Sequence, residues 1–236
     1  MSNIQIKYIV TSLILCCIVK IKTIHAQQNL DFGLYAGTSY YQGEINTSKL
    51  LYSPQFAYGG FIRYAFHTRW AIRGGIFTGG LKGNDDNSKF QYQHYRHAKF
   101  STPIVETTAQ LELNFLPYRQ GDKKKKWTPY VFTGATFLIA SYADHVYQPA
   151  IPFGIGLKAN LAPRLGVGIE WAYRKTFTDG LDNLSWYKTL PTTTTEHNYL
   201  LNKQIAYYHQ KDYYAFLGFF LTYKIRLTEE ICNAWE

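Results

Sequence analysis

The sequence contains little charge and no segment that could form a long apolar helix beyond its first residues. Asp, Glu, Lys and Arg together make up 17% of the 236 residues, below the roughly 25% of an ordinary soluble domain. No run of about 20 apolar residues follows residue 26, which excludes a helical membrane protein. Apolar residues still make up 46% of the chain and aromatic residues 17%, which excludes a disordered protein. An aromatic-rich chain with 18 glycines and few charges indicates a β protein.

Cysteine is scarce, and two of the three Cys residues lie in an N-terminal segment that resembles a secretion signal. The apolar stretch Tyr8–Val19 has the length of a signal-peptide core and is too short to span a bilayer. Ala26 offers a small residue for cleavage before the mature chain. We predict that residues 1–26 are a signal peptide. An uncleaved anchor, or a lipid attached to Cys16 or Cys17, is the alternative.

Cleavage after residue 26 removes three Lys and no acidic residue, and so lowers the formal net charge from +9 to +6. This charge is mild. Export also separates the chain from nucleic acid, so no nucleic-acid partner is expected.

Apolar residues alternate with small or polar ones at a period of two, which is the pattern of a β-strand with two different faces. The alternation is clearest over residues 165–174 and recurs elsewhere in the mature chain. The other segments are 30–41, 55–66, 70–82, 105–115, 127–142, 151–161 and 212–226. These eight strands are each about 10–14 residues long, where strands of soluble proteins average about 5–6. A tilted transmembrane strand needs about 9–11 residues, so the lengths favour a membrane barrel.

The connections between these strands alternate between short and long, with one exception, the ten-residue inside turn 117–126. Counting from a periplasmic start, the joints inside would be 67–69, 117–126 and 162–163, and those outside 43–54, 83–104, 143–149 and 175–211. Short inside turns and long outside loops are typical of bacterial outer-membrane barrels. We therefore predict an all-β fold for residues 27–236, a single eight-stranded antiparallel transmembrane barrel in the outer membrane with a short periplasmic C-terminal tail.

The two faces of the predicted strands differ in charge. One face is apolar through the strand middles and should contact lipid, with Tyr and Trp near the strand ends at the membrane interfaces. The predicted interfacial residues are Tyr40, Tyr41, Tyr64, Trp70, Trp127, Tyr142 and Tyr173. The other face carries the predicted inward charges Arg63, Arg73, Glu112, Lys158, Glu170 and Arg174. Side chains just fill an eight-stranded barrel, so these charges can pair inside it and no aqueous channel is expected.

Several segments together resemble the PorG-like family of outer-membrane proteins of the Bacteroidetes type IX secretion system. They are FGLYAGTSYYQGE (residues 32–44), PYVFTGATF (129–137), PFGIGLKANLAPRLGVGIEWAYRKTFTDGLDNLS (152–185), DYYAFLGFFLTYKI (212–225) and the late Cys232. The resemblance covers nearly the whole mature chain. It implies an eight-stranded barrel that accompanies a periplasmic ring made by a lipoprotein and its partner. Such a barrel would be an accessory of the secretion machine rather than its protein-conducting pore.

Cys232 is the only Cys that remains after cleavage, and it follows the last predicted strand. An odd Cys in an exported protein indicates an intermolecular disulfide or a free thiol. The family resemblance implies a bond to the ring lipoprotein that would tether the barrel to the ring. An inert buried thiol is the alternative.

Two other groups of residues are candidate contact sites. Lys123, Lys124, Lys125 and Lys126 form the longest like-charge run, in a predicted periplasmic turn. They are either a solvated turn or a contact for acidic partners and anionic headgroups. Asp179 and Asp182, in the family-like extracellular segment, are expected to fold their loop by accepting backbone N–H groups. Calcium binding is the alternative for these two residues, but it needs six or more oxygen ligands.

The sequence predicts no cofactor, no metal site and no enzymatic activity. His94 and His97 lie beside Arg and Lys residues, and no Cys or carboxylate cluster completes a metal shell. Ser141 and His145 are four residues apart near the end of a predicted strand. They leave a lipid-modifying enzyme as a minor alternative.

These patterns together predict a non-enzymatic component of type IX secretion in the cell outer membrane. Its partners would be outer-membrane lipid and the ring lipoprotein, and the barrel would anchor or stabilise the periplasmic ring. The main alternative is a generic small barrel that binds a ligand or surface partner through its extracellular loops. A soluble exported barrel that keeps a small ligand inside is disfavoured. The predicted inward face carries charges, whereas a ligand cavity is usually mostly apolar.

Overall fold

The structure is a computed structural model of the full chain. It describes residues 29–43, 50–84, 99–118, 126–143, 145–177, 181 and 212–227. Within these ranges, no helix is long and apolar enough to cross a membrane.

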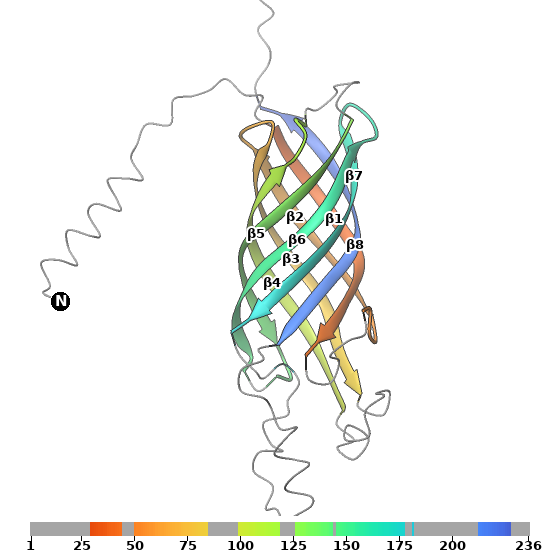
Figure 1. Cartoon of the computed structure of the whole chain (residues 1–236), viewed down its shortest axis with the longest axis vertical. Helices are drawn as coiled ribbons and strands as arrows, with labels where there is room; N and C mark the ends of the chain where they lie inside the picture. Colours follow the sequence, from red (N-terminus) through yellow and green to blue (C-terminus); the bar gives the residue numbers. More distant parts are fainter. Residues whose placement is uncertain are drawn as a thin grey trace, which may run out of the picture.

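Eight antiparallel strands form one closed barrel in which each strand pairs with its neighbours in the sequence, and β8 pairs with β1 (Figure 1). The strands are β1 (Asn29–Gln42), β2 (Gln55–Ala65), β3 (Trp70–Asn84), β4 (Lys99–Asn114), β5 (Trp127–Ala140), β6 (Tyr147–Asn160), β7 (Leu165–Thr176) and β8 (Tyr213–Arg226). Closure pairs the backbone of every strand on both sides and leaves no free sheet edge. The predicted all-β, eight-stranded antiparallel barrel is confirmed.

The two ends of the barrel differ in the length of their connections. The β2–β3 and β6–β7 connections are short, and both lie at the upper end in Figure 1. We call this end, which also carries the β4–β5 connection, the turn end. The connections 43–54, 85–98, 141–146 and 177–212 lie at the opposite end, which we call the loop end. The joints follow the predicted order of short and long, except that the β4–β5 connection 115–126 at the turn end is longer than the β5–β6 connection 141–146 at the loop end.

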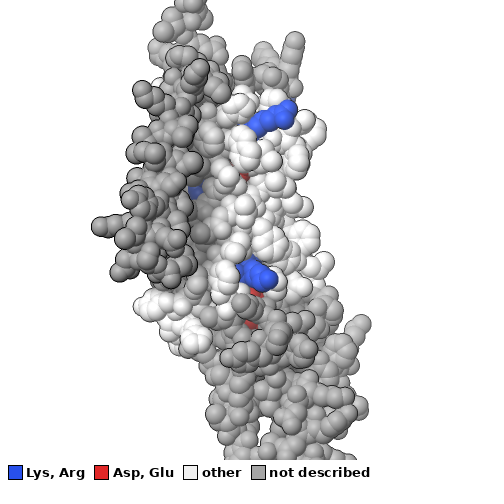
Figure 2. Space-filling model, turned by 60° about the vertical axis from the view of Figure 1, so that its left-hand side comes forward, with Lys and Arg blue, Asp and Glu red and all other residues white. Residues whose placement is uncertain are grey.

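Strand alternation separates an apolar outside from a mixed inside. Outward residues such as Leu34, Phe56 and Phe219 are about 70% exposed. Figure 2 shows one face of the barrel, where Lys and Arg lie near the two ends and the wall between them carries mostly uncharged residues. The inward positions hold buried aromatic, polar and charged side chains. The barrel thus has the apolar outside and polar inside that a lipid solvent requires.

The structure corrects two strand boundaries. β4 begins at Lys99, so the predicted connection 83–104 shortens to 85–98. β6 begins at Tyr147 rather than at residue 151. Pro103 in β4 and Pro149 in β6 obscured these strand starts in the sequence, because proline is usually read as a strand breaker.

One residue that was predicted to lie at the membrane interface points into the barrel instead. Tyr41 follows the inward phase of β1, is fully buried, and donates a hydrogen bond to Asp212 Oδ1 at 2.6 Å. Tyr40 is also buried, although it lies on the outward phase. Its hydroxyl oxygen accepts a hydrogen bond from Trp171 Nε1 at 2.8 Å. Trp70, Trp127 and Tyr142 are exposed, as interfacial residues should be.

Candidate functional site

The barrel interior contains a row of polar and charged residues that the strand register places side by side. Asp31 of β1 pairs with Arg63 of β2, Arg63 with Arg73 of β3, and Arg73 with Gln110 of β4. All four side chains are buried. Two arginines directly opposite each other on neighbouring strands repel. The row is therefore stable only if acidic groups elsewhere in the barrel compensate for them.

Glu112 of β4 provides most of this compensation. Its Oε2 lies 2.9 Å from Arg63 Nε and 2.8 Å from Lys158 Nζ, and its Oε1 lies 3.2 Å from Arg73 Nε. The side chain of Glu112 is completely buried. One carboxylate therefore joins cations from β2, β3 and β6.

Glu170 of β7 forms a second connection across the barrel. Its Oε2 lies 2.6 Å from Arg73 Nη1, and it accepts a hydrogen bond from the Tyr130 hydroxyl at 2.6 Å. Arg73 also donates from Nε to Gln110 Oε1 at 2.8 Å. Because β3 and β7 are not neighbours in the barrel, the Arg73–Glu170 pair crosses the lumen.

A third group lies nearer the loop end. Arg174 of β7 donates through Nη2 to Glu106 Oε1 at 2.7 Å and through Nε to the same carboxylate at 3.1 Å. Tyr214 of β8 donates its hydroxyl to Glu106 Oε2 at 2.7 Å. The fork of the guanidinium matches the carboxylate, and such charge-assisted bonds are stronger than neutral ones. This pair also joins two strands that are not adjacent, β4 and β7.

Aromatic rings fill the space between these charged groups. The Arg63 guanidinium lies 5.0 Å from the Phe61 ring centre, and the Arg73 guanidinium lies 5.0 Å from the Phe132 ring centre. Arg174 lies 4.3 Å from the Phe216 ring centre. Cations over aromatic faces are attracted by the ring quadrupole. Each arginine is thus held by carboxylates and by an aromatic face, as a buried charge requires.

The turn end is covered by the start of the β4–β5 connection. Tyr118 lies beyond β4, and its hydroxyl oxygen accepts a hydrogen bond from Lys224 Nζ at 2.6 Å. Lys224 Nζ also lies 4.1 Å from the centre of the Tyr118 ring and donates to Asn160 Oδ1 at 2.5 Å. Burial raises the pKa of the Tyr118 phenol, which therefore stays protonated. Tyr118 links the connection to the inside of β8.

Asp212, directly before β8, connects several segments at the loop end through hydrogen bonds. Its carboxylate accepts hydrogen bonds from the Tyr41 hydroxyl at 2.6 Å and from the Leu181 backbone N–H at 3.0 Å. Its carbonyl oxygen accepts from the Thr176 hydroxyl at 2.8 Å. Asp212 therefore ties β1, the end of β7 and the start of β8 together.

The buried charges balance, and this decides what the interior can do. Among the residues that the structure describes, five cations and five carboxylates are buried. They are Arg63, Arg73, Lys158, Arg174 and Lys224 against Asp31, Glu106, Glu112, Glu170 and Asp212. Ion pairs that cross the lumen at two levels, packed between aromatic rings, obstruct a continuous water path. These ion pairs therefore link strands on opposite sides of the barrel.

The structure places all six predicted inward charges inside the barrel and brings them into contact with acidic or basic partners. Of the predicted basic turn, only Lys126 is described, and it is exposed. The remaining candidates lie outside the described residues: Lys123, Lys124, Lys125, Asp179, Asp182, Cys232, His94, His97 and the segment 1–26.

The candidate catalytic pair, Ser141 and His145, lies at the loop end. The Ser141 N–H bonds the Pro103 carbonyl, and the His145 carbonyl oxygen accepts from Gln148 Nε2 at 2.7 Å. Within the described ranges, no group of three or more His, Cys, Asp or Glu could hold a metal ion.

Several interior residues were not identified from the sequence. Asp31 and Glu106 are buried partners of the predicted charges, and Lys224 is a buried cation that contacts Tyr118 and Asn160. Phe216 and Phe220 are buried on the inward face of β8. The two-residue period of the strands could have identified Glu106, because it lies an even number of residues, six, before Glu112 on β4 and therefore on the same face. Asp31 lies directly opposite Arg63 on the neighbouring strand. The phase of β8 also signals its inward face, because Thr222 and Lys224 lie on that face, whereas the outward positions Phe219, Leu221, Tyr223 and Ile225 are apolar or aromatic.

The chain matches one family model. That model is described as a domain of unknown function (DUF6089), and the match covers residues 8–234. The chain has no significant match among curated proteins.

Solved structures of small β-barrels resemble this chain at low sequence identity. The N-terminal barrel domain of Pseudomonas aeruginosa OprF aligns with a TM-score of 0.45 and 10% identity, over 85% of this chain and 100% of that chain. Ail of Yersinia pestis, solved with the heparin analogue sucrose octasulfate, aligns with a TM-score of 0.44 and 12% identity, over 84% and 99%. The outer membrane protein OprG of Pseudomonas aeruginosa aligns with a TM-score of 0.43 and 11% identity, over 85% of this chain and 97% of that chain.

Proposed function

We propose that this chain, which belongs to the DUF6089 family, is an outer-membrane barrel that anchors a periplasmic protein assembly. The observation that carries the proposal is the combination of a braced interior with an apolar outside. Ion pairs such as Arg73–Glu170 span the lumen, so the barrel is built to hold a position rather than to pass a solute.

The outward surface supports the placement in lipid. Exposed apolar side chains occur on all eight strands, among them Leu34, Phe56, Ile76 and Phe219. Soluble monomers rarely expose apolar patches of more than a few hundred Å². A barrel whose whole waist is apolar is stable in hydrocarbon, where its closed sheet satisfies every backbone group. In this orientation the turn end faces the periplasm and the loop end faces the outside.

The assembly that we propose is the type IX secretion machine. Support comes from the segments that resemble the PorG-like family and from the position of Cys232 beyond the last strand. The strand β8 would deliver the C-terminal tail to the periplasm, beside the turn that carries Lys123–Lys126. Both are then available to a ring lipoprotein, and a disulfide from Cys232 would hold the ring near the membrane.

A non-reducing pull-down tests this function. The full-length protein, tagged in an extracellular connection, is extracted from outer membrane with detergent and purified without reductant. We expect a periplasmic lipoprotein to co-purify in a band that separates on reduction, and we expect Cys232→Ser to abolish that band. A complex of unchanged yield in Cys232→Ser, together with no band shift of the wild-type complex on reduction, would retain the anchor function but contradict the disulfide.

The alternative function has a different outcome in the same experiment. Two results together would contradict the secretion role. The folded barrel would be purified without any partner protein, and deletion of its gene would leave secretion unchanged. They would support a barrel that acts through its extracellular connections instead.

A further inference from the structure

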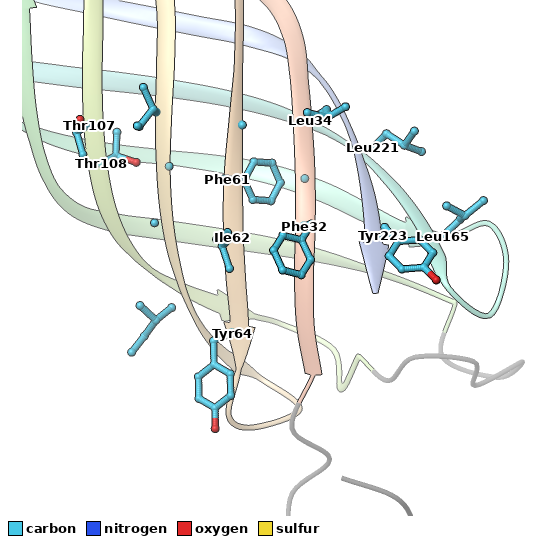
Figure 3. A pocket seen from close by; sticks show the side chains of 16 residues that line it. Phe32, Leu34, Phe61, Ile62, Tyr64, Thr107, Thr108, Leu165, Leu221 and Tyr223 are labelled. Carbon is cyan, nitrogen blue, oxygen red and sulfur yellow. The ribbon is translucent and has the colours of Figure 1, made fainter. Parts of the chain in front are cut away.

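The outward surface of β1, β2, β3 and β4 contains a shallow apolar hollow. Gly60 of β2 and Gly74 of β3 occupy outward positions where a side chain would point toward lipid, and both have open space on that side. The surrounding walls come from apolar side chains on the same strands (Figure 3). The wall residues are Phe32, Leu34, Ile62, Ile72 and Ile76. We call this hollow the glycine groove.

The strand register connects the glycine groove to the turn end. Tyr223 of β8 pairs with Phe32 of β1, Phe32 with Ile62 of β2, and Ile62 with Gly74 of β3. Three strand spacings of about 4.8 Å therefore separate Tyr223 from Gly74, or about 14 Å along the wall. Tyr223 lies three residues from the turn-end limit of β8 at Arg226, and Gly74 lies four residues from that of β3 at Trp70. The groove continues from this row toward the middle of the wall through Leu34, Gly60 and Ile76.

The turn-end rim of the groove carries a cation. Arg164 lies in the β6–β7 turn and donates from Nη1 to the Tyr223 hydroxyl at 3.4 Å. The carbonyl oxygen of Arg164 accepts the Lys224 N–H at 2.8 Å, which fixes the turn against β8. Arg164 is exposed, and Tyr223 lines the groove. A guanidinium beside a phenol at the edge of a lipid-facing groove is suited to a phosphate oxyanion.

We propose that this surface binds one glycerophospholipid of the periplasmic leaflet. Its phosphate contacts Arg164 and the Tyr223 hydroxyl, and one acyl chain lies along the row and fills the glycine groove. The inference rests on the outer-membrane placement proposed above. Both parts of the surface are needed for it: the cation sits at headgroup level, and the groove lies deeper in the hydrocarbon. Small residues permit close approach, so the chain gains van der Waals contact that a convex wall would not give.

Lipid titration followed by native mass spectrometry tests this site. The probe is dioleoylphosphatidylglycerol added to the purified barrel in detergent, and the measurement is the dissociation constant of the first bound lipid. We expect the double variant Gly60→Leu/Gly74→Leu to weaken it about tenfold, because the leucines fill the groove. We expect Arg164→Gln to weaken it about tenfold as well, because a charge-assisted contact is lost.

Two matched controls separate the site from general lipid contact. Ala159→Leu enlarges one apolar side chain on the outward face of β6, and no residue of β6 lines the groove. Lys175→Gln removes a cation that lies 5.8 Å from the ring centre of another β8 tyrosine, Tyr213, at the loop end. We expect both controls to bind the first lipid within twofold of wild type. The heat-modified band shift on electrophoresis verifies that each variant is folded.

Three results would overturn the inference. Equal affinity of wild type and the groove double variant would show that no chain occupies the groove. Equal loss in Arg164→Gln and Lys175→Gln would show a general charge effect. A wild-type dimer that the groove variant loses would show that a second copy covers the groove. Failure of the proposed function is distinct, since it would appear as a folded barrel that is purified without a periplasmic lipoprotein while the lipid affinities of wild type and variants still differ as stated.

Discussion

At the scale of single residues, Glu112 has the largest energetic role in the interior. Three cations from three strands converge on its carboxylate, and no solvent reaches it. Breaking a buried ion pair by removing one partner costs about 3–5 kcal/mol, because it leaves an uncompensated charge. Arg63 and Arg73 are directly opposite each other, so their repulsion adds to this cost.

We expect Glu112→Gln to destabilise the folded barrel by at least about 3 kcal/mol. The measurement is urea unfolding in lipid vesicles, followed by the band shift of folded barrel on electrophoresis. The double variant Glu112→Gln/Lys158→Met should recover part of the loss, since it removes one of the three cations that contact the Glu112 carboxylate. Stability of Glu112→Gln within about 1 kcal/mol of wild type would contradict the role of the carboxylate.

Asp212 holds the loop end through hydrogen bonds that its carboxylate accepts from the Tyr41 hydroxyl and from the Leu181 backbone N–H. It accepts the Leu181 N–H, which lies in the family-like segment after β7. We expect Asp212→Ala to speed hydrogen–deuterium exchange at the Leu181 amide at least about tenfold, the change that a loss of 1.4 kcal/mol gives. Asp212→Asn keeps an amide oxygen that can accept, so its exchange should lie between the two. No change in Asp212→Ala would show that another group protects this amide.

The sequence predicts which residues face inward but not which of them pair. Alternation places Arg73 and Glu170 on inward faces from their neighbours alone. Their contact at 2.6 Å depends on barrel closure, which brings together β3 and β7 across the lumen. The same limit applies to Glu106, because its partners Arg174 and Tyr214 come from the far side of the barrel.

At the scale of strands, the register leaves some positions with no room for a side chain. Gly134 of β5 pairs with Gln110 of β4, and a Cβ at Gly134 would overlap the carbonyl oxygen of Ala109. That oxygen belongs to the strand backbone, so it cannot move without disturbing the pairing. Gly74 of β3 differs, because the nearest atom to a Cβ there is the Thr108 oxygen at 3.9 Å.

We expect Gly134→Val to destabilise the barrel by about 2 kcal/mol or more, or to prevent folding, because overpacking against a rigid backbone is costly. Gly74→Val is the matched control and should fold as wild type does. The fraction of each variant that becomes heat-modifiable after refolding into vesicles measures the difference. Equal folding of the two variants would contradict the register between β4 and β5.

Strand number and order are predictable from the sequence, whereas some strand starts are not. The strict alternation over residues 165–174 places β7 almost completely. Pro103 and Pro149 conceal the starts of β4 and β6, because a proline lowers the probability of a strand in any local reading. The barrel accommodates these prolines through pairing on the rest of each strand, and no local pattern reports that compensation.

At the scale of the whole molecule, the filled lumen distinguishes an anchor from a channel. An eight-stranded barrel is just wide enough for side chains to fill it. Here the filling includes the cross-wall pairs Arg73–Glu170 and Arg174–Glu106, with aromatic rings between them. Tyr118 contacts Lys224 at the turn end, and Asp212 contacts Tyr41 at the loop end. An ion would have to displace several paired charges in order to pass, and displacing even one pair is costly.

We therefore expect no steady ionic current when the purified barrel is inserted into a planar bilayer. The variant Arg73→Ala/Glu170→Ala removes the pair that joins β3 and β7, so it should show brief current steps, because water can enter the space that the two side chains fill. The matched control Arg69→Ala/Lys175→Ala removes two exposed cations outside the lumen and should remain silent. A wild-type barrel with a sustained open current would show that the interior rearranges in lipid. It would replace the anchor with a channel as the function that the lumen supports.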